Sequence, residues 1–86
     1  MINVYVIKNS NFYGKPIFYE NDSALKKAMQ DMLDELKNQE DSQQLRDYVL
    51  NSLIYKIGEF DPVAGKIKSC FGKRFVGCLA DLLKGV

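Results

Sequence analysis

The chain has 86 residues, of which 47% are hydrophobic and 27% charged, and its formal net charge is +1. This length suits a single domain over residues 1–86, and the composition excludes both a disordered chain and one embedded in a membrane. No apolar run approaches the roughly 18 residues of a transmembrane helix, and the start of the chain lacks the basic region of a signal peptide. We therefore expect a soluble, cytosolic protein.

The first predicted strand covers residues 2–7. Its alternation places Ile2, Val4 and Val6 on one face and Tyr5 and Ile7 on the other. The polar segment 8–15 contains Asn, Ser and Gly, which favour turns, and a short apolar run follows at residues 16–19. These features predict a first β-hairpin.

A change of period at Asn21 predicts the main helix. The apolar residues recur at spacings of three and four, at Leu25, Ala28, Met29, Met32, Leu33 and Leu36. Asn21, Asp22 and Ser23 are all good N-cap residues. Residues 38–44 are polar and are interpreted as a linker inside the domain, after which Leu45, Tyr48 and Val49 indicate a short second helix.

The alternation of residues 53–60 predicts a further strand. It assigns one face to Leu53, Tyr55 and Ile57 and the other to Ile54, Lys56 and Phe60. Residues 61–65 suit a turn with Gly65 at positive φ, and Lys66–Lys68 returns as an antiparallel strand. In the C-terminal extension, residues 71–86, helical spacing of apolar residues predicts a short amphipathic helix over residues 73–84.

Together these elements predict an α+β fold. Two hairpins separated by a helix give a ββαββ order, and this order favours a four-stranded antiparallel sheet with the main helix on one face and a short C-terminal helix. The sheet face that the main helix does not reach must be covered by the C-terminal helix, by a second subunit or by a ligand. Dimerisation is therefore expected.

The segments Phe12–Phe18, Asn21–Asp22, Ile54–Asp61 and Gly65–Ile67, together with Ala28, carry a family resemblance. Over residues 2–68 the chain resembles the small nonstructural proteins of gokushovirus-type microviruses, which are single-stranded DNA bacteriophages. The resemblance implies a role in the host cell cytoplasm, tied to viral single-stranded DNA synthesis or handling rather than to the capsid. The chain departs from the family pattern by an extra stretch at residues 39–50 and by its hydrophobic tail.

Cationic and aromatic residues concentrate in the two flanks of the chain. Residues 21–50 carry four basic and seven acidic residues and one aromatic residue, Tyr48, whereas residues 51–86 carry six basic and three acidic residues. Binding of single-stranded nucleic acid needs cations along a phosphate path and rings on which bases stack. The candidate residues for binding single-stranded DNA are Lys8, Phe12, Tyr13, Lys15, Lys56, Lys66, Lys68, Lys73 and Arg74.

The alternative is a homo-oligomeric interaction or scaffolding protein of the phage without DNA contact. Large apolar residues of the tail would then pack against another subunit, a dimer being favoured, or against another phage protein. The candidate interface residues are Phe71, Phe75, Val76, Leu79, Leu82 and Leu83. The net charge of only +1 counts against DNA binding, because dedicated DNA-binding proteins are usually strongly basic.

The sequence offers little for catalysis. It contains no histidine, and the carboxylates Glu59 and Asp61, which flank Phe60, are interpreted as solvated groups at a hairpin mouth rather than an acid pair or cation site. Two cysteines, Cys70 and Cys78, are too few for a zinc site without histidine and are interpreted as reduced thiols. We expect no enzyme activity, no metal and no cofactor.

Overall fold

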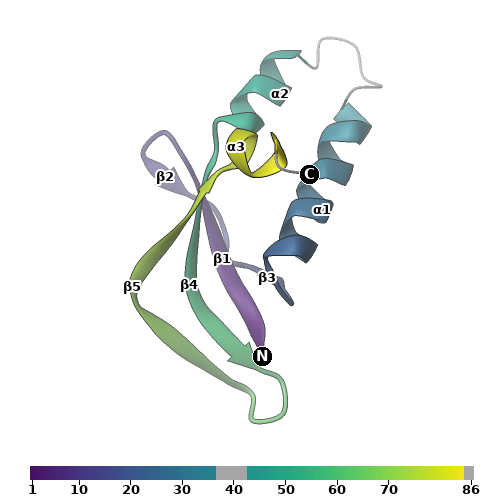
Figure 1. Ribbon diagram of the computed structural model, residues 1–86. Coiled ribbons are helices and arrows are strands. Elements are labelled where there is room, and N and C mark those ends of the chain that lie inside the picture. The colour runs from purple at the N-terminus through teal and green to yellow at the C-terminus, as the bar shows by residue number, and fades with distance from the viewer. Residues whose placement is uncertain (37–42, 85–86) are drawn as a thin grey trace.

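A computed structural model of the chain describes residues 1–36 and 43–84, apart from the side chains of residues 70, 71 and 84. In chain order the elements are β1 (Ile2–Asn9), β2 (Phe12–Tyr13), β3 (Ile17–Tyr19), α1 (Asp22–Leu36), α2 (Gln43–Leu50), β4 (Leu53–Asp61), β5 (Lys66–Cys78) and α3 (Leu79–Lys84). Figure 1 shows a curled antiparallel sheet with helices beside it. The α+β class predicted from the sequence is confirmed.

The sheet has β1 near its centre. Its strand order is β2-β1-β4-β5, with β3 also paired to β1, and every pairing is antiparallel. Both expected hairpins are present, as β1 with β3 and as β4 with β5. The predicted ββαββ order with four strands is not confirmed, because the described residues also contain β2 and because α2 stands between α1 and β4.

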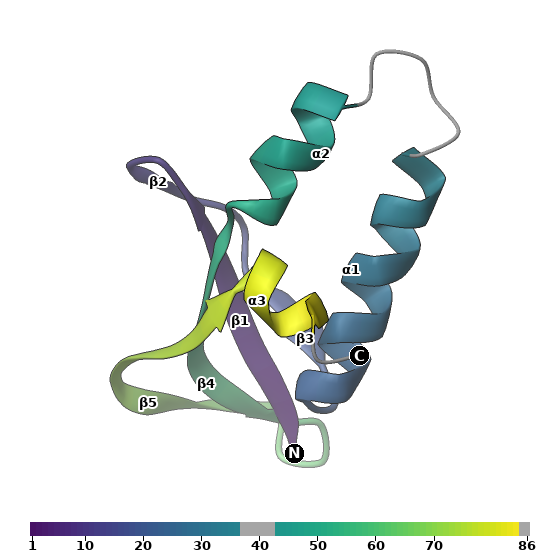
Figure 2. The same cartoon turned by 45° about the horizontal axis from the view of Figure 1, so that its top comes forward.

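The helices cover one face of the sheet. Figure 2 shows α1, α2 and α3 on the same side. Their contact with the sheet forms a core in which Tyr5, Leu25, Met29, Ile54 and Leu79 are all buried. Burial of Val4 and Val6 on the other side of β1 agrees with the predicted alternation of that strand.

The main helix begins where the sequence indicated. The side chain of Asn21 accepts a hydrogen bond of 2.8 Å from the backbone N–H of Ala24, so Asn21 is the N-cap. Leu25, Met29 and Leu33 are the buried residues of α1 and follow the predicted spacing. The second helix is also present as α2, although it begins at Gln43, inside the predicted linker, whose residues 38–42 lie outside the described part.

The prediction for the C-terminal extension was wrong in part. Instead of a helix over residues 73–84, β5 continues to Cys78 and only residues 79–84 are helical. The extension of β5 pairs with β4, where Phe75 lies opposite Tyr55 and Cys78 opposite Leu53. Hydrogen bonding to β4 thus outweighs the weak helical pattern, which Gly77 weakens further.

The face assignment of β4 also needs correction. A register shift between Lys56 and Gly58 leaves Ile57 out of the regular pairing with β1. Such a bulge inverts the alternation, so Phe60 shares a face with Tyr55 rather than with Lys56.

Among the described residues, no helix is long and apolar enough to cross a membrane.

Candidate nucleic-acid interface

The face of the sheet opposite the helices, here called the helix-free face, carries most of the exposed rings. Directly paired residues share a face, and Val6 lies opposite Tyr55, which in turn lies opposite Phe75. Lys8 lies opposite Tyr13 on the same side. Because Tyr5 and Ile54 point to the helices, these alternate residues point away from them.

Three of these rings form an aromatic cluster, here called the Tyr13 cluster, which consists of Tyr13, Tyr55 and Phe75. The ring centroids of Tyr13 and Tyr55 lie 6.0 Å apart in an edge-to-face arrangement, and those of Tyr55 and Phe75 lie 5.4 Å apart. Tyr13 is 42% exposed and Phe75 56% exposed. The cluster therefore offers accessible ring surface that is held in place by its own contacts.

Two lysines flank the cluster. The ammonium nitrogen of Lys73 lies 4.4 Å from the Tyr13 ring centroid and 5.4 Å from that of Tyr55, and the ammonium nitrogen of Lys8 lies 5.4 Å from the Tyr13 centroid. Lys73 also donates a hydrogen bond to the Tyr13 hydroxyl. This hydrogen bond, with the positive charges of both lysines, lowers the pKa of Tyr13.

Local backbone features bring these groups together. The turn after β1 places Ser10 at φ 55°, and the N–H of Gly14 donates a 2.8 Å hydrogen bond to the carbonyl of Ile7, which fixes β2 against β1. On the other edge, Gly58 pairs with Ser69 but Lys56 pairs with Arg74. The extra residues of β5 form a bulge that directs Lys73 towards the Tyr13 cluster.

The other predicted cations lie elsewhere. Lys56 pairs with Tyr5 on the helix side of the sheet and forms a 3.0 Å ion pair with Glu59, which lowers the pKa of that carboxyl group. Lys68 lies opposite Glu59 and Lys66 opposite Asp61. These three lysines are therefore out of phase with the residues of the helix-free face, because the strand alternation directs them to the other side.

The predicted residues near the first turn also separate. Phe12 is 79% exposed and lies opposite Asn9, one residue out of phase with Tyr13, so the two neighbouring rings face opposite sides of the sheet. Lys15 is exposed in the connection between β2 and β3. Of the nine predicted DNA-binding residues, the structure thus brings together Lys8, Tyr13 and Lys73.

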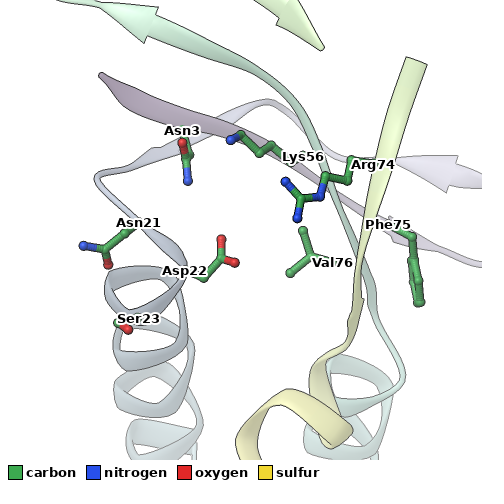
Figure 3. A pocket seen from close by; sticks show the side chains of 8 residues that line it. All are labelled: Asn3, Asn21, Asp22, Ser23, Lys56, Arg74, Phe75 and Val76. Atoms are coloured by element: carbon green, nitrogen blue, oxygen red, sulfur yellow. The ribbon is translucent and has the colours of Figure 1, made fainter. Parts of the chain in front are cut away.

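A polar cavity of about 410 Å³ lies between β5 and the start of α1 (Figure 3). Arg74 and Asp22 both direct their side chains into it, whereas the ring of Phe75 points away. Its lining residues are Asn3, Asn21, Asp22, Ser23, Lys56, Arg74, Phe75 and Val76. Because cations and a carboxylate share this space, the cavity is less suited to a polyanion than the helix-free face is.

A partly buried hydrogen-bond network beside this cavity, centred on the buried Tyr5, was not predicted from the sequence. The hydroxyl of Tyr5 donates a 2.5 Å hydrogen bond to Asp22 and accepts one of 2.9 Å from the side-chain amide of Asn3. Burial, followed by the hydrogen bond to Asp22, raises the pKa of Tyr5 to about 12. Tyr5 and Asp22 belong to different predicted elements, and only the packing of α1 on β1 shows that they meet.

Most residues of the predicted oligomer interface pack within the chain itself. Leu79 is buried in the core, and Val76, Leu82 and Leu83 pack against it. Phe75 belongs to the Tyr13 cluster, and the side chain of Phe71 lies outside the described part. Because α3 folds back on the sheet, its apolar face serves the intramolecular core.

The remaining reactive groups have structural partners. Glu59 is paired with Lys56, and the carboxylate of Asp61 accepts hydrogen bonds from the backbone N–H groups of Val63 and Ala64. The thiol of Cys78 donates to the carbonyl of Leu50 at 3.3 Å. Among the side chains that the structure describes, which exclude that of Cys70, no group of three His, Cys, Asp or Glu residues is placed to hold a metal ion.

The Tyr13 cluster with Lys8 and Lys73 is accordingly the candidate site. Comparisons of the chain with protein-family models, with curated proteins and with solved structures find no match.

Proposed function

We propose that this chain is a non-enzymatic protein that binds single-stranded nucleic acid, and single-stranded DNA in particular, on the helix-free face. The observation that carries the proposal is the Tyr13 cluster, in which accessible rings lie directly beside two ammonium groups. Rings on which bases stack, next to cations that contact phosphates, are the two requirements for binding a single strand.

The charge of the face supports an anionic partner. Among the described residues that the strand register assigns to the helix-free face there are two lysines, Lys8 and Lys73, and no carboxylate. A protein surface that docked here would have to supply acidic groups, whereas a nucleic acid brings a phosphate with every base. The helix-free face is therefore positively charged, although the net charge of the whole chain is only +1.

Exposed rings favour a single strand over a duplex. In a duplex the faces of the bases are stacked on one another, so a protein ring has access to them only after the helix opens. An unpaired base can stack on Tyr13 or Phe75 directly, with about 1–3 kcal/mol for each base. The protein should therefore bind a single strand more tightly than a duplex.

The resemblance to nonstructural proteins of gokushovirus-type microviruses supports a more specific role. Two segments that carry the resemblance contribute to the candidate site: Phe12–Phe18 contains Tyr13, and Ile54–Asp61 contains Tyr55. In this proposal the protein assists viral DNA synthesis or handling in the host cytoplasm. No reaction is assigned to it, and the rings and ammonium groups of the candidate site are interpreted as a binding surface.

The test is fluorescence anisotropy of the purified protein with a labelled single-stranded oligonucleotide and its duplex, at low and physiological salt. Binding should prefer the single strand. If Lys8 and Lys73 supply the phosphate contacts, the slope of log K against log salt should be about −1.4. Lys73→Gln should weaken binding, and Lys66→Gln, on the other side of the sheet, is the matched control.

Absence of binding to either form at tens of micromolar protein, in the measurable range of non-specific affinities, would contradict the proposal. Equal weakening by Lys73→Gln and Lys66→Gln would also contradict the site, since it would indicate a diffuse charge effect. The alternative candidate is a homo-oligomeric interaction protein of the phage without DNA contact. Exposure of Phe75 on the helix-free face favours it, and the mass of the protein in solution tests it.

A further inference from the structure

A second pair of rings lies at the other end of the helix-free face. The centroids of Phe18 and Phe60 are 6.1 Å apart in an edge-to-face arrangement. With Ile2 and Ile67 these rings line an open, wholly apolar cavity of about 270 Å³, here called the Phe18 pocket. Phe18 is 49% exposed and Ile67 60% exposed, so the pocket is accessible from solvent.

The strand register connects this pocket with the Tyr13 cluster. Phe18 lies opposite Val4 and Phe60 opposite Ile2, while Tyr55 lies opposite Val6. All of them therefore belong to one face and follow successive alternate positions of β1. Val4 and Val6, which lie on this face opposite members of the two ring groups, are both buried apolar side chains.

The distance between the ring groups follows from β1. Tyr55 and Phe60 pair with residues four positions apart, which corresponds to about 13 Å along the strand. A stacked strand of nucleic acid advances about 3.4 Å per nucleotide, so the same distance corresponds to about four steps. A more stretched strand covers it with fewer nucleotides.

We infer that the Phe18 pocket is a second base-stacking position of the same site, and that a single strand lies along β1 with a footprint of up to about five nucleotides. This inference rests on the proposed function. The open pocket accepts the apolar face of a base while the polar edges of the base remain in water. The strand then continues to Lys8 and Lys73, the cations that flank the other ring group.

A second copy of the chain is the competing occupant. A symmetric dimer through this face would bring the two lysines of each copy against a surface on which the register places no carboxylate. Two ammonium groups would lose water without gaining a counter-charge, which disfavours that arrangement. A polyanion that covers both ring groups supplies the missing charge at the Tyr13 cluster.

The experiment measures the affinity of wild-type protein for labelled oligothymidylates from dT3 to dT8, and repeats dT3 and dT8 with Phe18→Ala and Phe18→Tyr. Affinity should rise up to about five nucleotides and then level off. Phe18→Ala should weaken dT8 binding about fivefold or more and leave the affinity for dT3 unchanged. The affinity should then no longer rise with oligonucleotide length. Phe18→Tyr retains a ring, so its affinity should again rise with oligonucleotide length.

Val63→Ala is the matched control, because Val63 is 96% exposed at the tip of the β4–β5 turn and lies outside both ring groups. If wild type binds dT8 but Phe18→Ala binds it equally well, the inference is wrong and the proposed function stands. If wild type binds no oligothymidylate, both are wrong. A change from dimer to monomer on Phe18→Ala would identify the pocket as a subunit contact and overturn the inference.

Discussion

The ammonium group of Lys73 lies over the ring of Tyr13 and donates a hydrogen bond to its hydroxyl, although sixty residues separate them in the chain. Tyr13 is in β2 and Lys73 in β5, which are the two edges of the strand order β2-β1-β4-β5. In a flat sheet these edges would be about 14 Å apart. The contact therefore shows that the sheet curls and that the bulge in β5 directs Lys73 across its helix-free face.

The first prediction concerns the ring of Tyr13. Tyr13→Ala should weaken binding of a single-stranded oligonucleotide by about 1–3 kcal/mol, because it removes the ring that lies beside both Lys8 and Lys73. Tyr13→Phe keeps the ring and should retain most of the affinity. Fluorescence anisotropy at low salt measures both changes.

Phe12→Ala is the control for this prediction. Phe12 is the other residue of β2, and its side chain lies on the opposite side of the sheet. It should leave affinity almost unchanged. An equal loss from Phe12→Ala and Tyr13→Ala would show that the whole turn, and not the helix-free face, contacts the nucleic acid.

The second prediction concerns the titration of Tyr13. Its pKa is lowered chiefly by the hydrogen bond from Lys73, so Lys73→Met should raise the pKa of Tyr13 towards its ordinary value. A lowered tyrosine pKa stabilises the folded state only at pH above the ordinary value, and this contribution is lost as pH falls through the lowered one. Stability at neutral pH should not change by this route.

Ultraviolet absorbance of tyrosinate during a pH titration measures this shift, and Tyr13→Phe identifies which step belongs to Tyr13. Lys8→Met should produce a smaller shift, because Lys8 affects Tyr13 by charge alone and from a greater distance. An unchanged titration in Lys73→Met would show that the hydrogen bond does not persist in solution.

The sequence predicted the parts of the fold that depend on neighbours along the chain. Alternation identified β1, and the recurrence of Leu25, Met29 and Leu33 identified α1 with its cap at Asn21. The end of the chain was mispredicted because the choice between strand and helix near Phe75 depends on pairing with Tyr55, twenty positions earlier. Such non-local hydrogen bonding leaves no periodic signal in the sequence.

The candidate site was predictable only in part, for the same reason. Lys8 and Tyr13 were predicted as site residues and are paired across the hairpin of β1 and β2, so their proximity follows from that hairpin. Lys56 was assigned to the same site, but pairing with β1 turns it to the helix side. The bulge at Ile57 inverts the alternation beyond it, and this placed Phe60 on the unexpected face.

The third prediction uses the buried hydroxyl of Tyr5. Because its pKa is raised to about 12, the folded state favours the neutral phenol. The resulting stabilisation is fully present below the ordinary tyrosine pKa of about 10 and is lost as pH rises through about 12. Between about pH 10 and about pH 12 the wild-type protein should lose about 2 kcal/mol from this group.

Urea unfolding of wild type and Tyr5→Phe, at about pH 8 and about pH 11, measures the effect. At the lower pH, Tyr5→Phe should be less stable by about 1–3 kcal/mol, because Asp22 and Asn3 lose their partner. At the higher pH the difference in unfolding free energy between wild type and Tyr5→Phe should be smaller. Tyr48→Phe, at a ring that is exposed on α2, is the matched control.

The last prediction concerns Gly58, where β4 and β5 approach each other closely. A Cβ atom added at Gly58 would lie 2.7 Å from the carbonyl oxygen of Lys68, which is a backbone atom and cannot turn aside as a flexible side chain can. Gly58→Ala should therefore lower the free energy of unfolding by about 1–3 kcal/mol. Gly14→Ala is the matched control, since its Cβ would lie 3.5 Å from the nearest atom, an ordinary contact.

The same substitution should also affect the candidate site. Gly58 lies opposite Ser69, the last regular pair before the bulge that directs Lys73 towards Tyr13. If β5 moves away from β4 at this point, the hydrogen bond to Tyr13 should weaken and the pKa of Tyr13 should rise. If Gly58→Ala is as stable as wild type and its Tyr13 titrates as in wild type, the two strands lie further apart at Lys68 than in this structure. A loss of stability with an unchanged titration would instead separate the packing of the hairpin from the position of Lys73.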